Sequence, residues 1–135
     1  MLLQQLNRSD AEKVFGIYTN VKGSATVAGD VVVLDISTDV DGNRVTQPAT
    51  ASLKAVIGIS HVAIADGDPG LVQIFGYRGA ATVKRTNTTQ AAGLALIPAD
   101  GVDYLVSAAA GDFILLESLA TSTDPVSAKV HIRCM

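Results

Sequence analysis

One pair of acidic residues in this chain has a spacing that could support catalysis. Asp66 and Asp68 flank Gly67, and paired carboxylates act as general acid and base when a cleft separates their pKa values. The pair is followed directly by Pro69-Gly70, which is typical of an exposed turn. We therefore interpret these two carboxylates as turn residues.

A second acidic segment begins like a calcium-binding loop. Asp39-Val40-Asp41-Gly42-Asn43 places oxygen ligands at alternate positions. An EF-hand also needs glycine at its sixth position and glutamate at its twelfth, where this chain has Arg44 and Thr50. The flanking residues favour strands, so the segment is predicted to be a hairpin turn.

The candidate metal ligands and nucleophiles are few. The chain has two histidines, His61 and His131, and one cysteine, Cys134, whereas a zinc site needs three or four converging ligands. His131 and Cys134 are three positions apart, which on a strand places them on opposite faces. The sequence also lacks a Gly-x-Ser-x-Gly elbow, a phosphate-binding loop and a dinucleotide fingerprint. We expect no metal, no cofactor and no enzymatic activity.

The densest basic stretch contains Arg78, Lys84 and Arg85. We expect these side chains on one hairpin, Leu71–Arg85, that turns at Tyr77-Arg78-Gly79. Such a hairpin is either a solvated face or a contact for an acidic protein surface. The net charge of −3 is spread along the chain, so no nucleic-acid partner is expected.

The elements that must position these residues are short apolar segments that follow glycine turns. The turns contain Gly29, Gly67, Gly93 and Gly111, and we expect Gly29, Gly67 and Gly111 to need positive φ or close backbone packing. Apolar, β-branched runs bounded by such turns predict strands. The expected strands are Val14–Val21, Val31–Ile36, Leu53–Ser60, Leu71–Gly76, Ala80–Arg85, Gly93–Ile97, Tyr104–Val106, Phe113–Glu117 and Val126–Arg133.

These strands predict an all-β fold, a single compact antiparallel β-sandwich or small β-barrel with a short N-terminal arm. Long helical crossovers, which parallel sheets need, are missing from the sequence. The four turn glycines have no fixed period, so we expect no repeat array. With 48% hydrophobic residues but only three Phe, three Tyr and no Trp, the core must consist mainly of aliphatic side chains.

The chain of 135 residues has the length of one domain, which we place at residues 13–135 after an arm of residues 1–12. Leu2, Leu3 and Leu6 of the arm would be costly to expose, so we expect them to pack on a neighbouring molecule. A many-stranded sheet also leaves open edges that must be covered. We therefore expect a homo-oligomer. No signal peptide or membrane span is evident, which predicts assembly in a cytoplasm and no membrane partner.

The order of segments resembles the capsid decoration (cement) proteins of tailed bacteriophages over about residues 14–135. The most specific segment is Gly67–Gln73 with Gly76 after it. The resemblance rests on Val27–Asp35, Pro48–Leu53, Val56–Ser60, Ile64–Tyr77, Ala91–Leu96 and Ala128–Arg133, in that order. It implies a structural virion protein on the outer surface of the head, bound to the major capsid protein, and in the first place a homotrimer. On this interpretation the contact residues are Leu2, Leu3, Leu6, Arg78, Lys84 and Arg85.

Two other function classes remain open. A carbohydrate- or receptor-binding module of a head fibre would use the same β architecture, although sugar sites usually expose aromatic rings and this chain has six aromatic residues in all. A small β-barrel enzyme is the least favoured class, because no nucleophile and base have a matching spacing.

Overall fold

The computed structural model of the protein describes residues 12–37 and 41–135. Within these ranges the chain forms strands, turns and one short 3₁₀ helix, and it has no α-helix. The predicted all-β fold is therefore confirmed. The elements are β1 (Lys13–Asn20), β2 (Val31–Leu34), β3 (Arg44–Thr46), η1 (Leu53–Ala55), β4 (Val56–Ser60), β5 (Pro69–Lys84), β6 (Ala95–Pro98), β7 (Leu105–Ala108), β8 (Phe113–Leu115) and β9 (Pro125–Arg133).

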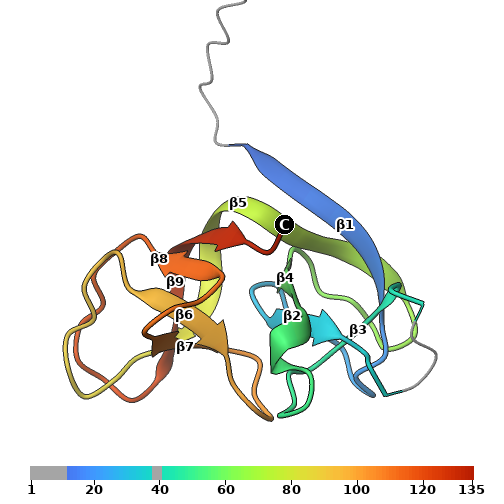
Figure 1. The fold of residues 1–135 in the computed structure, drawn as a ribbon, viewed down its shortest axis with the longest axis horizontal. Coiled ribbons are helices and arrows are strands. Elements are labelled where there is room, and N and C mark those ends of the chain that lie inside the picture. The colour runs from blue at the N-terminus through green and yellow to red at the C-terminus, as the bar shows by residue number, and fades with distance from the viewer. Residues whose placement is uncertain (1–11, 38–40) are drawn as a thin grey trace, which may run out of the picture.

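The nine strands form one sheet that closes on itself twice. Its order is β1-β3-β2-β4-β5-β7-β6-β8-β9, and two further pairings, β1–β5 and β5–β9, join strands that are distant in this order. The first of these closes β1 to β5 into one ring, and the second closes β5 to β9 into another. We call these rings the first and the second barrel. Figure 1 shows them as two lobes, with the long strand β5 arching across both.

The two barrels have the same topology. The first barrel runs from β1 to the first half of β5, and the second runs from the second half of β5 to β9. Both have the same strand order, and each contains one parallel pair at the equivalent place, β1–β3 in the first barrel and β5–β7 in the second. Isolated bridges at equivalent places, Thr26–Ile64 and Gln90–Leu119, close corresponding ends. The sequence did not indicate this duplication, because the connection from β7 to β8 is shorter than that from β3 to β4 and the two halves therefore share no single period.

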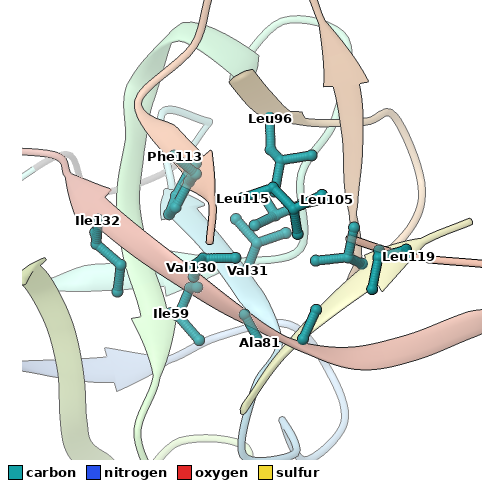
Figure 2. Packing of buried hydrophobic residues seen from close by; sticks show 12 residues of the cluster. Val31, Ile59, Ala81, Leu96, Leu105, Phe113, Leu115, Leu119, Val130 and Ile132 are labelled. Atoms are coloured by element: carbon teal, nitrogen blue, oxygen red, sulfur yellow. The ribbon is translucent and has the colours of Figure 1, made fainter. Parts of the chain in front are cut away.

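Residues at equivalent positions fill the interiors of the two barrels, but their side chains differ in size. Val32, Val45, Ile64 and Val72 fill the first barrel. The matching positions of the second barrel are Leu96, Leu105, Leu119 and Val130. The second core is joined by Val31 and Ile59, which belong to strands of the first barrel (Figure 2). Apolar packing therefore continues from one barrel into the other.

Polar contacts also connect the barrels. The Lys22 Nζ atom, in the loop after β1, lies 2.7 Å from Asp103 Oδ2, in the loop before β7. The backbone N–H of Val31 donates to the carbonyl of the same aspartate at 3.0 Å. The Thr82 N–H of β5 donates to the carbonyl of Gly29 at 3.1 Å. These bonds fix the orientation of the loops at the junction.

Two expectations about the strands need correction. Leu71–Arg85 is not a hairpin, because β5 runs without a turn from Pro69 to Lys84. Gly79, which was expected in the turn, lies in a β-bulge between Arg78 and Ala81. Residues 53–55 form the 3₁₀ helix η1 in place of the start of a strand. Among the described strands only β1–β3 and β5–β7 pair in parallel, so the sheet is mainly antiparallel as expected. A strand, not a helix, forms each of these crossovers.

Closure of the rings overturns the argument from open edges. Every described strand lies within a closed ring and has a neighbour on each side. A closed barrel removes the unpaired edges that an open sheet presents. The expectation of an oligomer cannot rest on such edges. The predicted arm contacts Leu2, Leu3 and Leu6 lie outside the described residues, as do Asp39 and Val40 of the acidic turn.

Candidate functional site

The three basic residues predicted to act together occupy two separate places. Arg78 lies at the bulge of β5, whereas Lys84 ends the strand and Arg85 follows it. Six residues of strand span about 20 Å. Lys84 Nζ lies 5.5 Å from the centroid of the Tyr104 ring, and Arg85 Nε donates to the carbonyl of Asp124 at 3.0 Å. These two side chains therefore belong to the second barrel and do not join Arg78.

Arg78 instead contacts a histidine that directly follows β4, the strand that pairs with the first half of β5. Its Nη1 lies 2.7 Å from Nδ1 of His61, and its Nε donates to the carbonyl of Ala80 at 3.1 Å. A guanidinium group only donates hydrogen bonds, so Nδ1 of His61 must accept. The neutral imidazole is thereby assigned its proton on Nε2.

A cavity of about 350 Å³ lies beside this pair, and we call it the bulge pocket. Its floor includes the buried side chain of Gln73, whose Nε2 donates to the carbonyls of Phe75 and Tyr77 at 3.2 and 2.8 Å. Lys13 Nζ approaches within 6.0 Å of the Tyr77 ring centroid. The lining residues are Lys13, His61, Gln73, Tyr77, Arg78, Gly79 and Ala80. No carboxylate is among them.

The bulge pocket is electropositive. Desolvation lowers the pKa of His61 below its ordinary value, and the positive charges of Arg78 and Lys13 lower it further. Burial likewise lowers the pKa of the Arg78 guanidinium. Among the described residues, no carboxylate lies within ion-pair distance of either cation. Two cations and a polar imidazole therefore converge on a space that has no internal counter-charge.

An exposed apolar stripe adjoins the pocket. Phe15 and Ile17 point outward from β1, and 38% and 71% of their surfaces are accessible. Leu71, the cross-strand partner of Ile17, is 39% accessible. The Phe15 ring packs edge-on against the His61 ring with centroids 4.9 Å apart, which joins the stripe to the pocket. We call this combined surface the β1 face; it consists of Lys13, Phe15, Ile17, His61, Leu71 and Arg78.

The stripe was missed at the level of sequence because apolar residues of a strand were assigned to the core. Antiparallel strands with one wet face normally carry polar residues outward. In β1 both faces are apolar, with Val14 and Tyr18 on the less exposed face and Phe15 and Ile17 outside. This departure from alternation was the available signal, and a group of exposed large apolar side chains marks an interaction surface.

The other candidate sites do not assemble. Asp66 and Asp68 lie in an exposed turn, where Asp66 Oδ1 accepts the N–H of Gly23 at 2.8 Å, so their interpretation as turn residues is confirmed. Within residues 12–37 and 41–135, no three His, Cys, Asp or Glu side chains group as a metal site would need. Burial, with a smaller effect from Asp112, raises the pKa of Cys134 to about 12, so this thiol is protonated at neutral pH.

No protein-family model matches the chain, and no curated protein matches it. Among the described residues, no helix is long and apolar enough to cross a membrane.

Proposed function

We propose that this chain is a structural virion protein that binds the outer surface of a tailed-phage head and stabilises the capsid lattice. Its partner on this proposal is the major capsid protein, and it acts as a homo-oligomer, in the first place a trimer. The order of turns and strands, which resembles that of decoration proteins, is the reason for proposing this class of function. The observation that carries it is the β1 face, an exposed apolar stripe beside an electropositive pocket.

The physical basis is the cost of exposing Phe15, Ile17 and Leu71 to water. Full burial of an exposed side chain of this kind contributes about 1.5–3 kcal/mol before the costs of association are subtracted, and Phe15 and Leu71, which are already more than half covered, contribute less than Ile17. The strands beneath them belong to a closed ring, so the face is held rigid in advance of binding. A preformed surface loses little conformational entropy on docking. A protein that must attach to a lattice in many copies benefits from both properties.

The test is co-sedimentation of the purified chain with expanded phage heads that lack it. We expect stoichiometric binding, and the double variant Ile17→Thr/Leu71→Thr should bind at least tenfold more weakly because it removes apolar contact area. Val27→Thr is the matched control, since Val27 is 63% accessible and lies outside the β1 face. If the intact chain does not sediment with heads, the proposal fails.

Two further measurements address the parts of the proposal that involve the arm and the oligomer. Deletion of residues 1–8 should leave the domain folded and weaken head binding, because the arm adds contact area outside the core. Equal binding by the truncated chain would remove the arm from the contact. Sedimentation equilibrium should give three times the monomer mass. Binding to a glycan array without binding to heads would favour the carbohydrate-binding alternative.

A further inference from the structure

The bulge pocket contains a half-buried cation whose charge is not neutralised within the described part of the chain. Arg78 donates through Nε to a backbone carbonyl and through Nη1 to a neutral imidazole. Its Nη2 group has no partner among the described residues. Charged side chains that lose water are normally paired, because an uncompensated charge in a partly desolvated site is costly. The guanidinium is thus positioned to receive a ligand that brings a negative charge.

The surroundings of Arg78 favour a planar oxyanion. Lys13 reaches the same pocket from β1, so a second positive charge faces the space in front of the guanidinium. Arginine recognises carboxylates through paired N–H donors, which gives both direction and strength to the contact. The cavity of about 350 Å³ has room for the carboxylate end of a side chain.

The apolar stripe decides where that carboxylate comes from. Phe15 packs against His61, so the exposed apolar stripe directly adjoins the pocket. A free small anion would leave the stripe wet, whereas a protein surface covers the stripe and fills the pocket together. We propose that the bulge pocket binds an Asp or Glu side chain of the protein on which the β1 face docks, with Arg78 and Lys13 as its counter-charges. This inference rests on the proposed function for the identity of that protein.

The first experiment measures head binding by charge variants. Arg78→Gln should weaken binding at least tenfold at physiological salt, and Arg78→Lys should lie between it and the original chain, because lysine keeps the charge without the paired donors. Lys54→Gln is the control, since it makes the same change in net charge at an exposed position on η1, away from the bulge pocket. It should change binding less than twofold.

Because Arg78 is half-buried, Lys13→Gln provides a second variant at an exposed position. It should weaken binding several-fold without affecting the fold. If the intact chain binds heads and both Arg78→Gln and Lys13→Gln bind as tightly, the pocket has no role and the inference is overturned while the proposed function stands.

A second experiment needs no heads and separates the two proposals. NMR signals of the His61 ring are followed while an acetylated, amidated tetraglutamate peptide is added, and in parallel with inorganic phosphate. The peptide should give a saturable shift and raise the pKa of His61, which Arg78 and Lys13 otherwise lower, and both effects should be lost in Arg78→Gln. Saturation by phosphate alone, or by neither probe, would contradict a carboxylate pocket whatever the result with heads.

Discussion

His61 is the residue whose chemistry depends most on its tertiary neighbours. Arg78 donates a hydrogen bond to Nδ1 of His61, and the Phe15 ring packs against the imidazole. Desolvation, together with the positive charges of Arg78 and Lys13, lowers the pKa of His61 below its ordinary value. The unfolded chain therefore takes up a proton at a higher pH than the folded chain. At the residue scale this makes His61 a source of acid sensitivity.

The corresponding prediction concerns stability against pH. The ordinary pKa of histidine is about 6.5. As the pH falls from 7.5 through this value, the unfolded state binds more protons than the folded state, and the free energy of unfolding decreases. Urea denaturation at pH 7.5 and 5.5 measures this decrease. It should be smaller in His61→Gln, which cannot titrate. An identical decrease in both proteins would show that other groups cause it.

Gln90 gives a second prediction at this scale. Its equivalent in the first barrel, Thr26, bonds to Ser60 Oγ at 3.2 Å and accepts from the N–H of Ile64. In the second barrel Leu115 replaces that serine, and the buried Gln90 amide has no hydrogen-bond partner among the described residues. Gln90→Met should therefore raise the free energy of unfolding by about 1–2 kcal/mol.

Thr26→Val makes the opposite comparison. It removes a satisfied hydroxyl and leaves Ser60 with one bond fewer, so it should lower the free energy of unfolding by about 1 kcal/mol. Chemical denaturation of both variants tests the pair. A loss of stability in Gln90→Met as large as that in Thr26→Val would contradict the idea that the Gln90 amide is unsatisfied.

At the element scale, the turn glycines behave as the sequence predicted, but for two different reasons. Gly29 and Gly67 have φ of +101° and +82°, in the region that disfavours side chains. Gly111 does not have positive φ; a Cβ there would overlap the Leu96 carbonyl of the neighbouring strand. Conformation decides the first two positions and close backbone approach decides the third.

Alanine substitutions at these three glycines should therefore lower the free energy of unfolding by different amounts. Gly67→Ala faces open space and should cost about 1 kcal/mol from backbone strain alone. Gly29→Ala adds a contact of 3.0 Å between the new Cβ and the Ala80 carbonyl, and Gly111→Ala places its Cβ on the Leu96 carbonyl of β6, so both should cost more. Thermal melting of the three variants measures the order. Three unchanged melting temperatures would refute the assignment of these turns.

At the scale of the whole molecule, β5 ties the two barrels together. It pairs with β1 and β4 in the first barrel and with β7 and β9 in the second. The cluster of Figure 2 continues this connection through Val31 and Ile59. Because one barrel cannot lose β5 without opening the other, the molecule should unfold in a single cooperative step.

Equivalent core truncations test this cooperativity. Val72→Ala in the first barrel and Val130→Ala in the second should each lower the free energy of unfolding by about 2 kcal/mol and leave the denaturant slope unchanged. Amide hydrogen exchange should accelerate in both barrels for either variant. If Val130→Ala accelerated exchange in the second barrel alone, the barrels would be independent units.

The sequence by itself determined the local features of this protein. Glycines that need special backbone geometry and apolar, β-branched runs between them act through the φ and ψ preferences of a few adjacent residues. These are enough to place most strands and to predict an all-β fold. They also identified Arg78 as a candidate contact residue, but wrongly grouped it with Lys84 and Arg85.

Tertiary structure decided everything that depends on distant pairing. Whether Gly79 makes a turn or a bulge is settled by β9, which pairs with β5 on both sides of it. Closure into two barrels depends on the β1–β5 and β5–β9 pairings, and these determine that Phe15 and Ile17 face water. The contact of Arg78 with His61 arises in the same way, because residues that are far apart in sequence meet only after the long-range strand register has formed.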